Sequence, residues 1–368
     1  MEQFIMKTKV YMGESALNHM NDFEIKRAFI ICDPYMKESG KVDLITECLD
    51  KTQAIYEIFA DVVPDPDLHV VTVGIGRMAA FAPDTIIALG GGSALDTAKS
   101  IRYICEQGTE NKKYRLIAIP TTSGTGSEVT SFAVITDPEK NVKYPLRDDA
   151  MMPDVALLAP ELIVSVPASV TADTGMDVLT HAVEAFASVR HCDFCDAFAE
   201  KAVKLVFDNL CTAVKCGEDL HARERVHNAS CMAGVAFNSA SLGLCHGMAH
   251  AMGARFHISH GRSNAMLLAH IISFNGEAAA DRYAKLAEVV GITCPTKKEA
   301  VLGLVRKVNQ LRGKIGIPDK VEALGISKEE FVEAIPQMAE VALADTCTQT
   351  NPRKPTREEI EKIFNRLV

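Results

Sequence analysis

The chain has 368 residues, of which 48% are hydrophobic and 24% are charged, a composition typical of a globular enzyme with room for two domains. Its formal net charge of −9, with no basic stripe of interleaved aromatic residues, argues against a nucleic-acid partner. Because the sequence has neither a run of about 18 apolar residues nor a continuous hydrophobic signal core at its N-terminus, we expect a cytoplasmic protein with no membrane partner.

The eleven cysteines predict reduced thiols, because an odd number spread through a large chain suits the cytosol better than a disulfide framework does. One CxxC motif occurs, Cys192–Cys195, and no second motif completes a metal site. We interpret it as two thiols on a helix. A metal or redox pair is the alternative.

Up to about Val166, apolar runs alternate with amphipathic helical stretches, which is the pattern of an α/β domain. Several runs are apolar throughout, as expected where helices cover both faces of a parallel sheet. We therefore predict an α/β domain over residues 1–166. Its expected strands are Arg27–Asp33, Ala54–Phe59, Thr85–Leu89 and Leu116–Ile119.

After Pro167 the β-branched runs give way to segments rich in Ala, Leu, Glu and Lys with helical periodicity, such as Asp193–Asn209 and Glu277–Val290. We predict an all-helical domain over residues 167–368. Pro160 and Pro167 mark the crossover, since two prolines around a short apolar run make a continuous helix improbable.

The segment Gly90–Ser93 joins the strand that ends at Leu89 to a helical stretch that begins at Ala94. A glycine turn before a helix N-terminus lets backbone N–H groups approach an anion, and the helix dipole favours its negative charge. The segment therefore predicts a pyrophosphate site. The GxGxxG fingerprint is not met, because Leu95 holds the place of its last glycine, and an ordinary turn is the alternative.

A second segment of this kind, Pro120–Glu128, follows the strand that ends at Ile119 and contains five hydroxyl side chains and two glycines. Such a loop offers many hydrogen-bond donors and little bulk. Ligands of α/β sheets collect at the carboxyl ends of the strands, so two such loops favour a nucleotide. Asp33, at the end of the first predicted strand, could bind an adenosine ribose and repel a 2′-phosphate, which favours NAD over NADP. A loop cap is its alternative role.

Two pairs of residues have the spacing of metal ligands on one helix face. Asp177 and His181 are four residues apart, as are His246 and His250, and His260 follows nearby. A lone histidine is usually structural, but this combination favours a divalent metal. For one carboxylate and three imidazoles, Fe(2+), Zn(2+) and Mn(2+) all remain open.

Taken together and in this order, these motifs resemble those of the iron-containing (group III) alcohol dehydrogenase family, and the likeness covers essentially the whole chain. The resemblance implies a Rossmann-like nucleotide-binding domain followed by an all-α metal-binding domain, the dehydroquinate synthase-like architecture. It points to the propanol dehydrogenase branch of bacterial propanediol utilisation. The stretches shared with that branch are Lys143–Leu146, Pro160–Leu162, His227–Ser230 and Thr350–Arg353.

By this resemblance the metal, Fe(2+) in the family, has four ligands, which fall on Asp177, His181, His246 and His260. The NAD(H) contacts of the family fall on Asp33, Gly91, Gly92, Ser93, Asp96, Thr121, Thr122, Ser123, Thr125 and Lys143. One departure from the family is Phe132, where some members have Asn, so any contact by that side chain is lost.

The implied activity is the interconversion of short-chain primary alcohols and aldehydes, propanal and 1-propanol above all. His250 is the expected proton relay, and a hydrogen bond to a neighbour of the metal ligands is its alternative role. The resemblance also implies a homodimer or larger homo-oligomer and association with a bacterial microcompartment. The alternative functions are those of a glycerol dehydrogenase, a lactaldehyde/1,2-propanediol oxidoreductase, a dehydroquinate synthase-like lyase and a non-catalytic NAD-binding protein.

Overall fold

A computed structural model describes residues 3–108, 113–138 and 142–368. It divides into two compact units, one of Met6–Ser165 and one of Val166–Val368 together with the first residues of the chain. Phe4 belongs to the second unit, where its ring stacks on Phe194 with 5.3 Å between the centroids. No helix of the described residues is long and apolar enough to cross a membrane.

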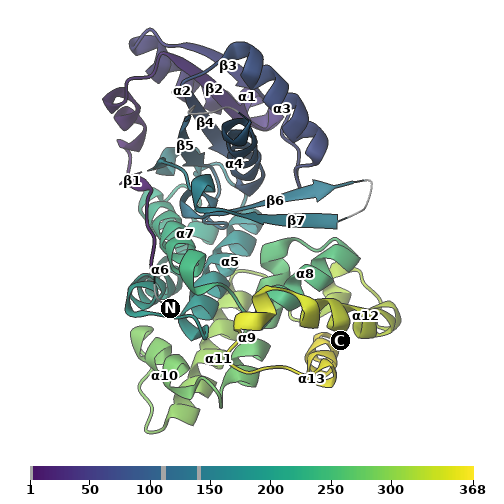
Figure 1. Ribbon diagram of the computed structural model, residues 1–368. Helices are drawn as coiled ribbons and strands as arrows, with labels where there is room; N and C mark the ends of the chain where they lie inside the picture. The colour runs from purple at the N-terminus through teal and green to yellow at the C-terminus, as the bar shows by residue number, and fades with distance from the viewer. Residues whose placement is uncertain (1–2, 109–112, 139–141) are drawn as a thin grey trace. The chain divides into compact units, whose positions relative to one another are not determined.

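The first unit contains a parallel six-stranded sheet in the order β1-β8-β5-β4-β2-β3 (Figure 1). A separate antiparallel pair, β6 and β7, was not predicted from the sequence. The strands are β1 (Lys9–Met12), β2 (Arg27–Cys32), β3 (Ile55–Phe59), β4 (Thr85–Gly90), β5 (Arg115–Pro120), β6 (Phe132–Asp137), β7 (Val142–Arg147) and β8 (Val155–Leu158).

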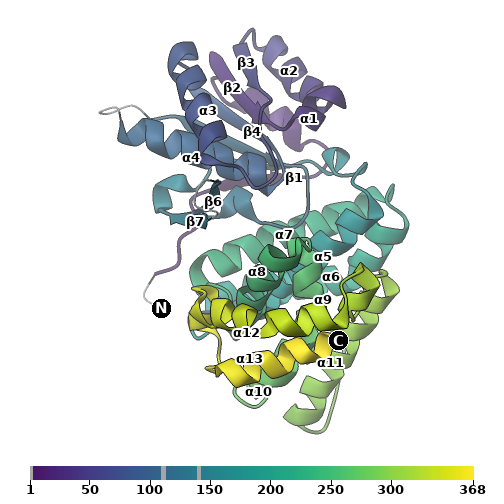
Figure 2. The same cartoon turned by 90° about the vertical axis from the view of Figure 1, so that its right-hand side faces the viewer.

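Helices cover both faces of the parallel sheet, which explains why its central strands are apolar throughout. Ala28 and Ile30 of β2 pack into one core with residues of α2, whereas Phe29 and Ile31 pack into the other core with residues of α3 and α4. Figure 2 shows α3 and α4 on one side of the strands and α1 and α2 on the other. The helices are α1 (Pro34–Glu38), α2 (Lys41–Lys51), α3 (Leu68–Phe81) and α4 (Gly92–Gln107).

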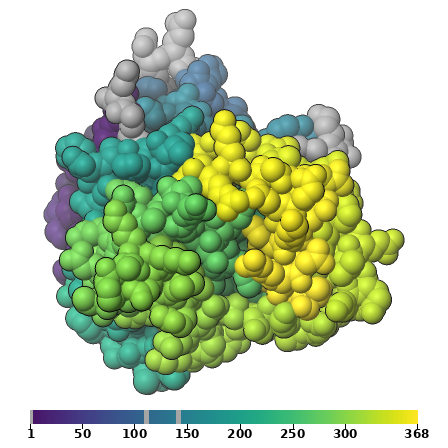
Figure 3. Space-filling view, turned by 90° about the horizontal axis from the view of Figure 1, so that it is seen from below, coloured from purple at the N-terminus to yellow at the C-terminus, as the bar shows by residue number. Residues whose placement is uncertain are grey.

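The second unit is helical, and its described residues contain no strand. Figure 3 shows its surface, where the yellow C-terminal segment lies beside the green middle of the unit. The predicted fold class, an α/β part followed by an all-helical part, is confirmed. The helices are α5 (Ala168–Ala187), α6 (Asp193–Lys215), α7 (Leu220–Ala240), α8 (Leu244–Phe256), α9 (His260–Asn275), α10 (Ala280–Val289), α11 (Lys297–Lys314), α12 (Lys328–Ala344) and α13 (Arg357–Phe364).

Helix α5 is the centre of this unit. It packs against α6, α7 and α9, and α8 packs against α9 and α12. Met176, Leu179 and Phe186 of α5 are buried in the shared core. Because one face of α5 lies in this core, polar side chains on the same helix that are also buried need partners from neighbouring helices.

The CxxC motif lies at the start of α6. The Sγ atoms of Cys192 and Cys195 are 3.3 Å apart as free thiols, and all eleven cysteines of the chain are free. Neither thiol belongs to a group of metal-type side chains within the described residues. The structure therefore agrees with two thiols at a helix start.

Candidate metal centre and nucleotide-binding loops

Four side chains of the metal-binding type lie together in the helical unit. Asp177 and His181 are one turn apart on α5, His246 lies in the first turn of α8, and His260 is the first residue of α9. The ligand-type atoms of the four all lie within 4.8 Å of one another. The structure therefore brings together the four residues predicted as metal ligands from positions up to 83 residues apart in the sequence (260 − 177).

The spacing of these atoms suits one ion. Asp177 Oδ1 lies 3.4 Å from His260 Nε2 and 3.7 Å from His246 Nε2, and Asp177 Oδ2 lies 3.9 Å from His181 Nε2. Ligand atoms about 2.1 Å from a tetrahedral ion are roughly 3.4 Å from one another. Three imidazoles and one carboxylate fit Fe(II), Zn(II) or Mn(II).

The electrostatics of the cluster favour the protonation states that a metal needs. Burial holds the pKa of His246 well below its ordinary value, so its imidazole is neutral. Burial raises the pKa of Asp177, but the three nearby histidines and the hydrogen bond from Asn264 outweigh it, and the net pKa is lowered. A neutral imidazole and an ionised carboxylate are the metal-binding forms.

Glu184 connects the cluster to the start of α8. Its Oε2 lies 2.6 Å from His246 Nδ1 and accepts the Gly243 N–H at 3.0 Å, while Oε1 accepts the Cys245 N–H at 2.6 Å. The carboxylate thus caps α8 from a different helix and leaves His246 Nε2 on the side of Asp177. Burial raises the pKa of Glu184 to about 7.

Asn264 lies one turn after His260 on α9. Its amide nitrogen donates to Asp177 Oδ1 at 2.8 Å and is 3.2 Å from Nε2 of both His246 and His260. Its Oδ1 is buried and has no hydrogen-bond partner among the residues that the structure describes. Asn264 therefore holds the carboxylate of Asp177 in place while it contacts two further members of the cluster.

His250 lies one turn after His246 on α8 but outside the four-residue cluster. Its ring stacks on that of His260 with 5.3 Å between the centroids, and its Nδ1 is 2.8 Å from Asp345 Oδ2. The other oxygen of Asp345 accepts the Cys347 N–H at 2.7 Å. Burial would raise the pKa of Asp345, yet the hydrogen bond and the charge of His250 lower it. In the neutral form of His250 that donates Nδ1–H to this carboxylate, Nε2 carries the lone pair.

The first predicted nucleotide loop has the backbone that an anion site requires. Gly90 ends β4 with φ +151°, and a Cβ there would lie 2.7 Å from the Cβ of Ala94, so only glycine fits. Gly91 is the N-cap of α4, which begins at Gly92. A Cβ at Gly92 would meet Thr125 Cγ2 at 2.9 Å, so the two loops lie against each other.

Two charged side chains of α4, Lys99 and Asp96, hold the second loop by hydrogen bonds. Lys99 Nζ donates to Ser127 Oγ at 2.8 Å and to the Phe132 carbonyl at 2.8 Å, and burial lowers the pKa of this lysine to about 8. Asp96 accepts from Ser127 Oγ at 2.7 Å and from the Val134 N–H at 2.9 Å. Each carboxylate oxygen of Asp96 thus accepts a hydrogen bond from the protein. Asp96, a predicted cofactor contact, therefore helps to hold the loop in place.

Asp33 caps α1, since its Oδ1 accepts the Met36 N–H at 3.0 Å. It also lies near the first loop, because its Oδ2 would be 3.5 Å from a Cβ at Gly90. The capping role weighed as an alternative is therefore real, and it leaves the second carboxylate oxygen on the side of the loop. The side chain of Lys143, another predicted contact, lies outside the described part of the chain.

Two family models match nearly the entire chain. One, described as Iron-containing alcohol dehydrogenase, matches residues 7–160, and the other, described as Fe-containing alcohol dehydrogenase family, C-terminal, matches residues 171–368. The chain belongs to the iron-containing alcohol dehydrogenase family. The resemblance found in the sequence is confirmed, and this alcohol dehydrogenase is an enzyme that interconverts alcohols and aldehydes.

Individual relatives align with this iron-containing alcohol dehydrogenase over 99% or more of its length. It is 44% identical over 373 residues to the 1-propanol dehydrogenase PduQ of Salmonella typhimurium, and the match covers 100% of both chains. The NADPH-dependent butanol dehydrogenase of Clostridium saccharobutylicum is 38% identical over 99% of this chain and 97% of its own.

Solved structures share the fold. The crystal structure of a 1,3-propanediol oxidoreductase has a TM-score of 0.94 at 33% identity and covers 100% of both chains. A sulfoacetaldehyde reductase from Bifidobacterium kashiwanohense, solved in complex with NAD+, has a TM-score of 0.90 at 27% identity and covers 100% of this chain and 98% of its own.

Four residues around the predicted sites were not assigned a role from the sequence. For two of them a signal was present: Glu184 follows Asp177 by seven residues, and Asn264 follows His260 by four, so helical periodicity places each on the same face as a ligand. For Asp345 and Lys99 the sequence does not indicate the hydrogen-bond partners, because these come from distant segments.

Proposed function

We propose that this alcohol dehydrogenase reduces propanal and similar short-chain aldehydes to primary alcohols with NADH, and that Asp177, His181, His246 and His260 hold an Fe(2+) ion. The observation that carries the proposal is the four-residue cluster, whose donor types and spacing fit one divalent ion. The full-length likeness to a 1-propanol dehydrogenase supports the substrate.

A metal ion held by these residues would supply Lewis acidity toward the substrate oxygen, and NAD(H) would supply or accept the hydride. Asp177 contributes the negative charge of the site, and Asn264 fixes the carboxylate by its hydrogen bond of 2.8 Å. Glu184 keeps His246 in the tautomer whose Nε2 faces the cluster.

His250 is proposed as the group that moves the proton between the substrate oxygen and water. It is 43% exposed at its side chain, so it can exchange protons with solvent. Asp345 fixes its tautomer through Nδ1 and leaves Nε2 to accept or return a proton. This arrangement resembles the oriented histidines of other acid–base catalysts.

The proposed nucleotide contacts are made by the loops at the carboxyl ends of β4 and β5. Gly91 and Gly92, at the N-terminus of α4, would offer backbone N–H groups to the pyrophosphate. The hydroxyls of Thr121, Thr122, Ser123 and Thr125 would add donors. The solved relative with NAD+ supports this cofactor, whereas the NADPH-dependent relative makes the role of Asp33 worth a direct test.

The substrate is tested by kinetics on anaerobically prepared, Fe(II)-loaded enzyme. We expect kcat/KM with NADH to be highest for propanal, with ethanal at least about 10-fold lower because a missing methylene weakens apolar contact with the transition state. Butanal and lactaldehyde serve as the longer and the hydroxylated competitors. Preference for lactaldehyde in this assay, or faster oxidation of glycerol than of 1-propanol with NAD+ in the reverse direction, would contradict the proposal and favour a diol or glycerol dehydrogenase.

The cofactor preference is tested by Asp33→Ser. Serine keeps the N-cap hydrogen bond to Met36 but removes the negative charge. The ratio of kcat/KM for NADH to that for NADPH should fall by about 10-fold or more, because repulsion of the 2′-phosphate is lost. Thermal unfolding checks that the cap survives. An unchanged ratio would mean that Asp33 does not face the ribose and acts only as a cap.

From the resemblance alone, we further propose a homodimer or larger homo-oligomer that associates with a bacterial microcompartment. Sedimentation of the purified enzyme tests the first part. Co-fractionation of the enzyme with intact microcompartments tests the second.

A further inference from the structure

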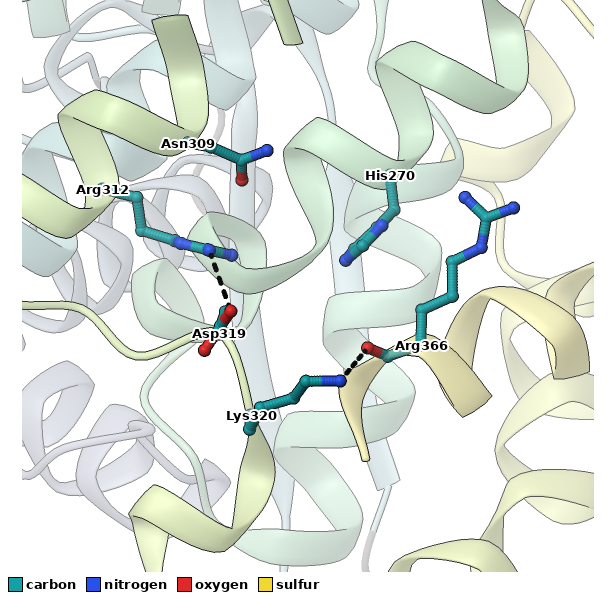
Figure 4. A pocket seen from close by; sticks show the side chains of 6 residues that line it. All are labelled: His270, Asn309, Arg312, Asp319, Lys320 and Arg366. Atoms are coloured by element: carbon teal, nitrogen blue, oxygen red, sulfur yellow. Dashed lines mark hydrogen bonds and ion pairs between the residues drawn. The ribbon is translucent and has the colours of Figure 1, made fainter. Parts of the chain in front are cut away.

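A polar pocket lies in the helical unit away from the metal-type cluster. Its cavity of about 370 Å³ is of the size of a small-molecule site. Its walls come from α9, α11, the segment before the 3₁₀ turn at Val321–Leu324, and the last turn of the chain, Asn365–Leu367. Figure 4 shows the lining side chains, which are His270, Asn309, Arg312, Asp319, Lys320 and Arg366.

The pocket is positively charged on a protein of net charge −9. Among the lining side chains, those of Arg312, Lys320 and Arg366 are cationic and only that of Asp319 is anionic. Burial, together with these three cations, lowers the pKa of His270 to about 4, so its ring is neutral at physiological pH. The positive charge therefore comes from groups that stay charged across the physiological range.

Arg312 is the unusual member of this pocket. Only 8% of it is exposed, yet its Nε and Nη1 have no hydrogen-bond partner among the residues that the structure describes. Its nearest opposite charge, Asp319 Oδ2, lies 3.8 Å from Nη2, beyond hydrogen-bond distance. Two buried guanidinium nitrogens without acceptors are costly, and in Figure 4 the side chain of Arg312 extends toward the interior of the pocket.

Lys320 is already oriented by the protein. Its Nζ donates to the main-chain oxygens of Arg366 at 3.0 Å and Val368 at 2.7 Å. An ammonium group has three donors, so one N–H remains for a ligand. The pocket therefore combines an unsatisfied guanidinium fork with a partly fixed ammonium group.

We propose that this pocket binds a small phosphate-bearing anion. The planar fork of an arginine matches two phosphate oxygens, and the cationic side chains of the lining outnumber its one carboxylate, which favours an anion. The site is distinct from the metal-type cluster, because His270 follows His260 by ten residues on α9, about 15 Å along the helix. Inorganic phosphate and an organic phosphate monoester share this chemistry.

The test is calorimetric titration of the full-length, NADH-saturated enzyme with inorganic phosphate and with ethyl phosphate, against chloride at equal ionic strength. NADH occupies the nucleotide loops, where a helix N-terminus would itself attract phosphate. We expect saturable binding that Arg312→Met and Arg366→Met each weaken by at least about 10-fold. Tighter binding of ethyl phosphate would identify the monoester as the ligand class, and equal or weaker binding would identify inorganic phosphate.

Arg306→Met is the matched control, since Arg306 is an exposed arginine of α11 that does not line the pocket. It should bind phosphate like the unmodified enzyme. Arg366 is exposed, so its variant tests the site even if Arg312→Met affects folding. Binding no stronger than that of chloride, or binding that Arg366→Met leaves unchanged, would overturn the proposal.

Discussion

Replacement of His260 by alanine is expected to abolish turnover, with a loss on the order of 10³-fold or more, because one of four proposed ligands to the metal disappears. His260 is the best position for this test. Its side chain is 42% exposed, whereas that of Asp177 is 6% exposed, so truncation of His260 removes a ligand without opening a cavity in the core. Metal content after anaerobic Fe(II) loading should fall together with activity.

Asp177→Ala should cause the same loss of metal and should also lower the stability of the folded protein. It removes the only carboxylate of the cluster and leaves the amide of Asn264 without its acceptor at 2.8 Å. In both variants NADH affinity, followed by fluorescence titration, should stay unchanged, because the proposed nucleotide contacts come from other segments of the chain. His221→Ala, an exposed histidine of α7, is the control. Full metal content and full activity in His260→Ala would refute the ligand assignment.

The features that could be predicted from the sequence are those set by local pattern. The strand Thr85–Gly90 is apolar at nearly every position and ends on the first of three consecutive glycines, so its type and the loop after it follow from nearby residues alone. The pair Asp177 and His181 likewise follows from the helical repeat. The helix boundary differs from the prediction: α10 begins at Ala280, three residues after the predicted start at Glu277.

The features that could not be predicted depend on which segments meet in space. Glu184 acts on a helix that begins 60 residues later, at Leu244, and nothing near position 244 indicates that a carboxylate from α5 caps it. The sequence pattern does not indicate the antiparallel pair of β6 and β7, since Pro145 lies inside β7 and a proline normally argues against a strand. Nothing near Arg312 in the sequence indicates that its Nε and Nη1 lack hydrogen-bond partners, since this depends on the other segments that line the pocket.

Asp345, beside the proposed proton relay, is a further contact between distant segments that the sequence does not predict. It lies 95 residues after His250 in the sequence (345 − 250), in the segment that follows α12, and reaches the histidine at 2.8 Å. His250 itself could be proposed from its spacing to His246. Its orientation could not, because the partner that fixes its tautomer is supplied by the packing of α12 against α8.

His250→Gln is expected to lower kcat by roughly 10- to 10⁴-fold, the usual range for loss of a general acid–base group. Glutamine is similar in size and can still hydrogen-bond Asp345, but it cannot gain or lose a proton near neutral pH. Bound metal and NADH affinity should be retained, since His250 lies outside the four-residue cluster. The pH–rate profile should lose a limb that the unmodified enzyme shows, because a titrating group has been removed.

Asp345→Asn tests the hydrogen-bond partner of the proposed proton relay. The carboxylate serves two donors, His250 Nδ1–H and the Cys347 N–H, with one oxygen each. Asparagine has only one carbonyl oxygen, so its NH₂ group must face one of these donors and the tautomer of His250 is no longer fixed. We expect a smaller loss of kcat than in His250→Gln, with metal content unchanged. Metal analysis and pH–rate curves on the same preparations separate the outcomes: loss of metal in His250→Gln would make His250 a ligand, and an unchanged rate and profile would leave it with a structural role only.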